Sequence, residues 1–438
     1  MIVIIGAGIS GLVAAWELQN KGAEYILLEC GASPGGYIRT EHPKNYVLDC
    51  GPNSILCDDE LLNFFAKTGL KEKLLPAKEV SKSRFIYKNG SYKKLPSNPL
   101  SLLTSDFFSL KSKVKVLTEP FRNSGTTVPN ETLSIFFERH FGKEVVDYAL
   151  SPFIAGIYNG DPAKLLAEQT FPSLVHYEKE YGSVLKGFLK NASQRRKSYN
   201  FKNGMQEMTD GLAAQLNNLW LNTKVLTLKK EGQKIIITCE QNGMQKSILC
   251  DKVILTLPAF AAAAVLKEEY PQFYSTLTNI YYPPMALVHT AYKKDKVKTS
   301  LNGFGALNPK KENLFSAGSI WTSSVFDGRC PEDEILFATF IGGSQSSENY
   351  NLPDEELKQA VHKELAVNFK INATPVFQRL SRWERTIPQY DINSLEAKVI
   401  VSKLKADNIY TCATWHGGVS LGDSIKKSLK ATEIILAS

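Results

Sequence analysis

The sequence lacks the patterns that mark several large classes of protein. Its seven cysteines are odd in number and scattered, and no Cys-x-x-Cys pair occurs, so neither a disulfide framework nor a zinc site is predicted. No apolar run reaches the ~18–20 residues that span a bilayer; the longest, residues 254–266, contains Pro258. Glycine (29) and proline (20) are near average, which excludes collagen-like and low-complexity chains.

What is present describes an ordinary globular chain. The 438 residues are 43% hydrophobic and 22% charged, and at about 150 residues a domain this length suggests roughly three units. The net charge of +8 permits an acidic ligand or an anionic membrane surface but does not demand nucleic acid. A basic stretch is either a solvated loop or an anionic lipid contact; it comprises Lys186, Lys190, Arg195, Arg196, Lys197 and Lys202. No aromatic stacking platform accompanies it, so no nucleic-acid partner is predicted.

The apolar pattern predicts the order of the elements. A strand at Ile2–Ile5 leads into a helix that stops near Lys21-Gly22, and a strand resumes at Tyr25–Glu29. Residues 95–200 are predicted to be largely helical, from apolar side chains at three- and four-residue steps. Antiparallel strands are predicted over 224–257, at Val225–Leu228, Lys234–Cys239 and Lys246–Leu257, and further strands at 286–291, 335–341 and 409–413, with a final helix at 423–437.

A glycine pattern between the first strand and the first helix predicts dinucleotide binding. Such a turn needs glycine for tight bending, for close approach to a pyrophosphate and for helix packing, and its helix N-terminus offers free N–H groups to phosphate. An acid at the end of the second strand suits a ribose diol. The residues are Gly6, Ala7, Gly8, Ile9, Ser10, Gly11 and Glu29.

Two further glycine segments favour FAD over NAD. The first, Gly36-Tyr37-Ile38-Arg39, resembles the continuation found in large FAD oxidases of the amine oxidase type, where the arginine lies near the flavin phosphate; a solvated surface charge is the alternative for Arg39. The second is a turn at 415–422 that follows a strand and opens a helix. In two-domain flavoproteins the matching turn lies beside the flavin pyrimidine ring, where a helix N-terminus stabilises negative charge. His416 is assigned to this turn rather than to proton transfer.

Several stretches resemble protoporphyrinogen oxidase, the oxygen-dependent flavoenzyme family of haem synthesis. They include Gly51-Pro52-Asn53-Ser54, Arg84–Tyr87, Phe136–Tyr148, Pro152–Pro162, Arg382-Trp383-Glu384 and Gly417–Ser420. The resemblance covers nearly the whole chain and is strongest to the plant mitochondrial type, with the 131–172 block specific to the family.

The resemblance implies an α/β fold with a Rossmann-type FAD-binding domain, a mixed-sheet substrate domain and a helical membrane-associated domain. We expect the FAD-binding domain at 1–77, 201–257 and 403–438, the substrate domain at 78–94 and 258–402, and the helical domain at 95–200. Further FAD contacts are then expected at Gly51, Asn53, Val225, Val419, Ser420 and Leu421. For Asn53, an ordinary turn asparagine is an equal alternative to an FAD contact.

The resemblance also implies a six-electron oxidation of a porphyrinogen, with FAD as cofactor and oxygen as acceptor. Arg84 matches an arginine that pairs with a substrate carboxylate, a bidentate task suited to a guanidinium, although a surface arginine on a strand is the alternative. Gly156, Leu301 and Leu314 match positions beside the macrocycle, although an ordinary turn glycine and core leucines are the alternatives. No general base and no metal ligand are predicted.

Other functions stay open at this point. One is a different FAD oxidoreductase, such as an amine oxidase or carotene desaturase, and another is a non-enzymatic protein that keeps the dinucleotide fold as a scaffold. The substrate is protoporphyrinogen IX or coproporphyrinogen III, with the former favoured. Because no leader precedes the first strand, we expect a bacterial enzyme in the cytoplasm, attached peripherally to the inner face of the cell membrane; a homodimer is also considered.

Overall fold

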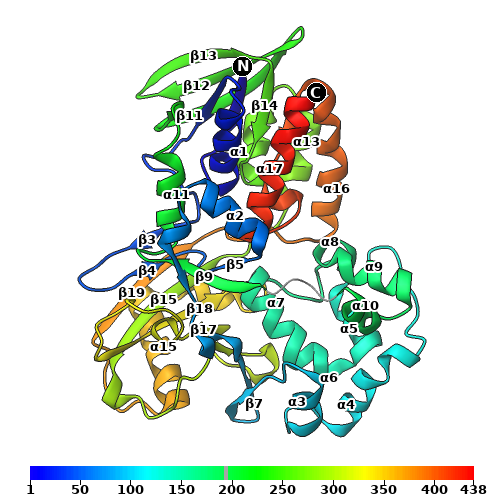
Figure 1. The fold of residues 1–438 in the computed structure, drawn as a ribbon, viewed down its shortest axis with the longest axis vertical. Helices are drawn as coiled ribbons and strands as arrows, with labels where there is room; N and C mark the ends of the chain where they lie inside the picture. The colour runs from blue at the N-terminus through cyan, green and yellow to red at the C-terminus, as the bar shows by residue number, and fades with distance from the viewer. Residues whose placement is uncertain (192–195) are drawn as a thin grey trace.

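The computed structural model describes residues 1–191 and 196–438, so Arg195 of the basic stretch lies outside the described residues. Figure 1 shows three regions: a sheet-and-helix region that holds both termini at the top, a second sheet region at lower left, and a helical region at lower right. The two sheet regions draw on segments that are far apart in the sequence, whereas the helical region is built from the continuous stretch 99–190.

A five-stranded parallel sheet organises the upper region. Its order is β10-β2-β1-β14-β20, and Ile4 in the central strand pairs with Leu27 on one side and Ile254 on the other. Strands buried on both faces read as continuous apolar runs, which explains the run at the N-terminus. The strands are β1 (Ile2–Ile5), β2 (Tyr25–Leu28), β10 (Leu219–Trp220), β14 (Lys252–Leu255) and β20 (Ile409–Thr411).

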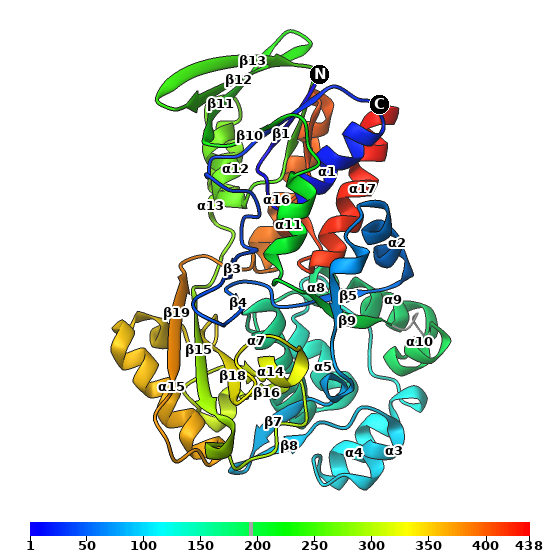
Figure 2. The same ribbon diagram turned by 60° about the vertical axis from the view of Figure 1, so that its left-hand side comes forward.

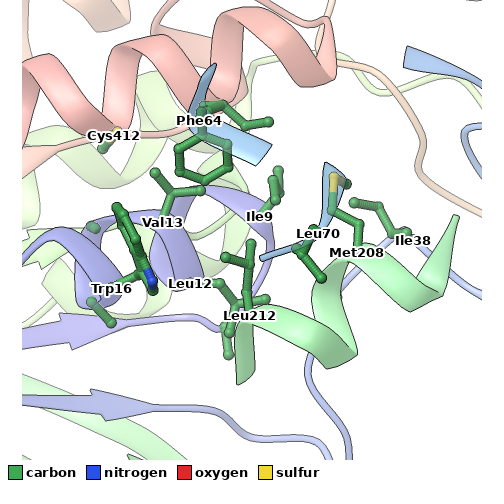
Figure 3. Packing of buried hydrophobic residues seen from close by; sticks show 14 of the residues in the cluster. Ile9, Leu12, Val13, Trp16, Ile38, Phe64, Leu70, Met208, Leu212 and Cys412 are labelled. Carbon is green, nitrogen blue, oxygen red and sulfur yellow. The ribbon is translucent and has the colours of Figure 1, made fainter. Parts of the chain in front are cut away.

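Helices cover one face of this sheet, and Ile2 and Ile4 point into that core. The helices are α1 (Ile9–Asn20), α2 (Asp59–Lys67), α11 (Gln206–Ala213) and α17 (Leu421–Ala437). In Figure 3, Trp16 of α1 lies near Phe64 of α2 and Leu212 of α11, with the Trp16 and Phe64 rings edge to face at 5.6 Å.

Val3 and Ile5 point into a second core on the opposite face. This face carries an antiparallel sheet of β11 (Thr223–Glu231), β12 (Lys234–Gln241) and β13 (Met244–Cys250), together with α12 (Ala259–Leu266), α13 (Pro271–Thr278) and α16 (Ile392–Val401).

The last of the three antiparallel strands was predicted too long. Residues 246–257 divide at Asp251 into β13, which is antiparallel to β12, and β14, which is parallel to β1 in the other sheet. The apolar run over Val253–Leu255 is continuous because β14 is buried between β1 and β20.

A mixed seven-stranded sheet forms the lower left region, in the order β19-β15-β18-β17-β16-β7-β8. Its one parallel pair joins Phe85 of β7 to Ala306 of β16. Helix α15 (Asp354–Phe369) packs on one face through Leu357, Val361 and Phe369. The strands are β7 (Phe85–Lys88), β8 (Ser91–Lys94), β15 (Met285–Lys293), β16 (Gly305–Leu307), β17 (Gly318–Ile320), β18 (Glu334–Gly342) and β19 (Phe377–Trp383).

The third region is helical, as predicted for most of residues 95–200. It comprises α3 (Pro99–Thr104), α4 (Leu110–Leu117), the short turn η3 (Glu119–Phe121), α5 (Leu133–Phe141), α6 (Lys143–Val145), a π turn at Val146–Leu150, α7 (Ser151–Tyr158), α8 (Ala167–Thr170), α9 (Pro172–Tyr181) and α10 (Val184–Lys190). The end of the predicted range is instead a strand, β9 (Lys197–Phe201), paired with β5 (Ile55–Cys57) and β6 (Leu74–Pro76).

A buried polar cluster ties the helical region together. The His140 ring lies between two carboxylates, with Nδ1 2.7 Å from Glu119 and Nε2 2.9 Å from Glu178. Arg139 bridges Glu178 and Glu131. Burial alone would raise the pKa of Glu178, but hydrogen bonds from Arg139, Thr127 and His140 lower it to about 2. These contacts hold η3, α5 and α9 against one another.

None of the described helices is both long and apolar enough to cross a membrane. All seven cysteines are free thiols.

Candidate functional site

The first glycine turn leaves the start of α1 open. Gly6 has φ of +102°, and a Cβ at Gly11 would lie 1.9 Å from the Gly6 carbonyl oxygen, so the helix can approach the strand only with glycine there. Gly8 caps α1 without any side-chain hydrogen bond, and a Cβ there would meet nothing within 4 Å. The first N–H groups of the helix therefore face open space, the arrangement that binds a diphosphate.

Glu29 holds the rim of this turn. Its carboxylate accepts hydrogen bonds from the Ala7 N–H at 2.7 Å and the Gly31 N–H at 2.8 Å. Its carbonyl accepts from the Thr223 N–H at 2.8 Å, which brings β11 and the half-buried Val225 to the same edge. The structure thus assembles the predicted acid, the glycine turn and the β11 segment that bears Val225. Ile9 and Ser10 are buried in the first turn of α1.

The second glycine segment packs directly on the first. The Gly35 N–H donates to the Ala7 carbonyl at 2.8 Å, and a Cβ on Gly36 would lie 3.5 Å from the Cα of Gly8. Ile38 is buried beside this contact region. The two predicted glycine segments therefore form one continuous backbone surface.

Trp383 reaches this surface from the seven-stranded sheet. Its indole N–H donates to the Cys50 carbonyl at 2.7 Å, its ring lies 5.2 Å from that of Tyr37, and the exposed Arg39 guanidinium stacks over it at 5.2 Å. A Cβ on Gly51 would lie 2.0 Å from the Tyr37 carbonyl oxygen, so glycine is required there. The sequence prediction included Arg39 and Tyr37 but not Trp383 as a site residue, because nothing in the pattern of β19 shows which surface it meets.

Asn53 is held through its backbone. Its carbonyl accepts from the Asn200 side chain at 2.7 Å, and the same amide donates to the buried Asp49. Burial raises the pKa of Asp49 despite its hydrogen bonds from Asn200, Met205 and Thr40. The FAD contact at Asn53 stays a prediction.

The C-terminal turn is built differently. Gly417 and Gly418 take φ of +128° and +69°, and the Ser420 hydroxyl caps α17 by accepting from the Asp423 N–H at 3.0 Å. Val419 packs against the core of the helical region, whereas Leu421 packs against the core around α1. The turn therefore joins the two regions.

Arg84 stands at the start of β7 with an exposed side chain. Its guanidinium lies over the Phe304 ring at 4.8 Å and donates to the Ser81 carbonyl at 3.1 Å. Among the described residues no carboxylate forms an ion pair with it within 4.0 Å, so the guanidinium is available to an acidic ligand.

Gly156 of α7 lies against Leu307 of β16. A Cβ at Gly156 would meet the Leu307 side chain at 2.9 Å, and a Cβ at Gly318 would meet it at 3.2 Å. The sequence prediction missed Leu307, because no local pattern distinguishes it from the neighbouring leucines. Glycine at position 156 allows the helical region and the mixed sheet to touch here.

Of the two predicted leucines, Leu301 lies apart from this contact, whereas Leu314 lines a cavity that also includes Ala155 and Asn308, the chain neighbours of Gly156 and Leu307. Leu301 is buried in the core under α15, in the cluster that includes Trp321 and Phe369, so packing accounts for it. Leu314 lines a cavity of 80 Å³ with Asn159, Ser344 and others. Ligand pockets usually measure about 300–1,000 Å³, so this cavity alone does not hold a macrocycle.

The uncapped α1, the open space at Gly8 and the acid beside it fit the diphosphate and ribose of a dinucleotide. Residues 9–435 match the model of the flavin-containing amine oxidoreductases. The chain belongs to the flavin-containing amine oxidoreductase family. As a member of this family it is an FAD-dependent oxidoreductase.

Several relatives that match over nearly their full length are named as porphyrinogen oxidases. The chain is 31% identical to "Protoporphyrinogen oxidase 2, chloroplastic/mitochondrial" of Arabidopsis thaliana and 30% identical to "Protoporphyrinogen oxidase, mitochondrial" of Nicotiana tabacum, over 100% of this chain and 94% of each relative. It is 26% identical to "Coproporphyrinogen III oxidase" of Bacillus subtilis over 98% of this chain and 96% of the relative. The predicted resemblance is confirmed.

Solved structures show the same fold. A provisionally named protoporphyrinogen oxidase from Exiguobacterium superposes with a TM-score of 0.82 at 20% identity, covering 100% of this chain and 99% of that one. Putrescine oxidase bound to putrescine gives 0.72 at 18% identity, with 100% and 99% coverage. The predicted α/β flavoprotein fold with a mixed sheet is thereby confirmed.

Proposed function

We propose that this chain oxidises a porphyrinogen, with protoporphyrinogen IX favoured over coproporphyrinogen III, to the porphyrin in haem biosynthesis. The single observation that carries the proposal is the full-length identity to plant protoporphyrinogen oxidases, which extends through the helical block as well as the flavin motifs. The likeness to putrescine oxidase concerns the fold alone.

The proposed reaction balances with oxygen as acceptor: one porphyrinogen and three oxygen molecules give one porphyrin and three hydrogen peroxide molecules. When bound, FAD supplies the acceptance of two electrons and one proton in each round. The residues of the chain supply binding and orientation: the start of α1 holds the diphosphate, Glu29 the ribose, and the segments at Gly36–Arg39 and Gly51 border the cofactor.

Arg84 is the proposed partner of a propionate on the substrate. Its exposed guanidinium has no carboxylate partner among the residues described, and a planar guanidinium binds a carboxylate bidentately. Gly156 is proposed to bring a helix backbone close to the macrocycle, with Leu307 beside it. Leu301 stays a prediction that its core position does not favour, and Leu314 stays a prediction.

The domain bounds expected from the sequence are kept as a proposal. We propose that the FAD-binding domain combines residues 1–77, 201–257 and 403–438, the substrate domain 78–94 and 258–402, and the helical domain 95–200. The packing of α12, α13 and α16 with the five-stranded sheet argues for extending the FAD-binding domain to include them.

Attachment to a membrane surface is proposed for the helical region. Large apolar side chains are exposed on α3, α4 and η3, including Leu110 (79%), Leu103 (54%) and Phe121 (89%), and lysines 111, 113 and 115 lie on the same helix as Leu110. Apolar side chains flanked by lysines bind anionic lipid.

Flotation with vesicles rich in phosphatidylglycerol tests this proposed membrane attachment. Binding that L110E/F121E abolishes supports it, and equal recovery of both proteins contradicts it. The cytoplasmic location and a homodimer stay predictions.

The substrate site is tested with R84A. Losing a charge-assisted contact worth about 1.5–3 kcal/mol raises KM for the porphyrinogen about 10- to 100-fold, while FAD stays bound. R84K keeps the charge but not the bidentate geometry, so its KM lies between those of the wild type and R84A. An unchanged kcat/KM in R84A removes this residue from the substrate site.

A further inference from the structure

Basic side chains gather behind the C-terminal glycine turn. Lys427 of α17 reaches back to the turn, and its ammonium donates to the carbonyls of Ala413 and Gly417, each at 2.5 Å. These two carbonyls bracket the turn Thr414–His416. Figure 1 shows α17 running from the middle of the molecule to the C-terminus at the top, so this contact lies where the three regions meet.

Lys398 of α16 approaches the same turn from another side. Its ammonium donates to the Gln169 side chain of α8 at 2.6 Å and lies 4.7 Å from the centre of the Tyr390 ring. The Tyr390 hydroxyl in turn donates to the Thr414 carbonyl at 2.6 Å. Both lysines are therefore connected to the same short turn by hydrogen bonds or by one intervening ring.

Neither ammonium forms an ion pair with a described residue. No carboxylate of the described residues lies within 4.0 Å of Lys398 or Lys427, although buried charges are normally paired. Burial lowers the pKa of Lys427, against the opposing influence of Cys412 and Asp423. Burial and then the charge of Lys427 lower the pKa of Lys398 to about 8, so Lys398 is mainly cationic at pH 7.

His416 completes the group but carries no charge at neutral pH. Burial, followed by the two lysines, lowers its pKa to about 4. Its Nδ1 lies 3.2 Å from the Thr411 hydroxyl. The turn is thus backed by two lysines and one neutral ring, and a positive charge on these lysines favours a nearby anion.

We propose that Lys427 and Lys398 are positioning residues that fix the C-terminal turn and stabilise negative charge on the reduced flavin. The inference rests on the proposed placement of the flavin against Val419–Leu421. Transfer of a hydride, two electrons with one proton, to a neutral ring leaves one net negative charge. A positive field behind the turn lowers the free energy of that charged state relative to the oxidised one.

The test measures the two-electron reduction potential of bound FAD and its affinity for sulfite, a probe that also leaves negative charge on the ring. In K427M and K398M the sulfite dissociation constant rises about tenfold, and the reduction equilibrium weakens about tenfold, or about 30 mV. K430M removes a lysine from the exposed side of α17 and leaves both values unchanged. Equal values in all four proteins overturn the inference.

K427M also removes two hydrogen bonds from backbone carbonyls, so its fold is a separate question. K427R keeps the charge and is expected to keep the potential. K398M loses only a bond to a side-chain amide, so its potential decides the electrostatic claim even where K427M fails to hold FAD.

The pH dependence of the potential gives an independent readout. Lys398 faces Lys427, His416 and Tyr390, and Asp423 of α17 acts on Lys427. Reduction of the flavin raises the pKa of Lys398, so extra proton uptake makes the potential of the wild type fall more steeply with pH just above about 8. K398M lacks this extra slope, and retention of the slope contradicts the assignment.

Dithionite is the reductant in these experiments, so no porphyrinogen is needed. Shifted potentials without porphyrin formation refute the proposed function and keep this inference. Porphyrin formation with unshifted potentials supports the proposed function and refutes this inference.

Discussion

The two glycine turns of the flavin region share a pattern and differ in construction. Both follow a parallel strand and open a helix. The N-cap of α1 is Gly8, which has no side chain to form a capping hydrogen bond. The N-cap of α17 is Ser420, whose hydroxyl accepts a hydrogen bond from an N–H of its own helix. The first turn leaves its donors to a ligand. The second satisfies part of its own donors and has two lysines behind it. The same sequence signature therefore serves anion binding in one place and positioning in the other.

The largest effect is expected from G8V. A Cβ there meets no protein atom within 4 Å and the φ of −69° suits valine, so the variant folds, but its side chain fills the diphosphate space. We expect no bound FAD and no absorbance near 450 nm, with an unchanged circular dichroism spectrum. A yellow G8V protein breaks the assignment of the first turn.

G11A changes the neighbouring glycine and affects the fold. Its Cβ would lie 1.9 Å from a backbone oxygen, and neither the strand nor the helix can shift without repacking the core. We expect the free energy of unfolding of the cofactor-free protein to fall by about 3 kcal/mol or more, measured in urea. Stability equal to that of G8V contradicts the close packing of α1 on β1.

G417A tests the second turn. A Cβ at Gly417 meets nothing within 4 Å, as at Gly8, but φ is +128°. The cost is therefore backbone strain of about 1–3 kcal/mol rather than a clash. Urea unfolding that matches the wild type shows that the turn relaxes freely.

S420A is expected to have the smallest effect. Loss of the cap on α17 costs about 1 kcal/mol of stability and frees one N–H, while FAD stays bound. Loss of FAD from S420A, at unchanged stability, means that the hydroxyl contacts the cofactor instead of capping the helix.

Local patterns predicted the parts of the fold that depend on near neighbours. The first strand, the helix after it and the glycine turn need only apolar spacing and the steric demands of glycine, and they lie where expected. Residues 252–255 were assigned to the antiparallel run, because an apolar strand shows no sign of its partner when that partner is β1, about 250 residues away.

The candidate site shows the same limit. Glu29 and the glycines are recognisable within one short segment, whereas Trp383, Lys398 and Lys427 reach the site from separate elements with no motif around them. Leu301 and Leu307 are both leucines near a glycine in sequence, but Leu301 packs in the core under α15 whereas Leu307, in β16, lies beside Gly156 of α7, and only the tertiary structure separates them.

The most direct test of the central claim is porphyrin fluorescence. The purified FAD-loaded protein is incubated in air with protoporphyrinogen IX and, separately, with coproporphyrinogen III. We predict porphyrin formation well above the rate without protein, faster with protoporphyrinogen IX, with three peroxide molecules per porphyrin. A yellow, folded protein that accelerates neither oxidation contradicts the claim.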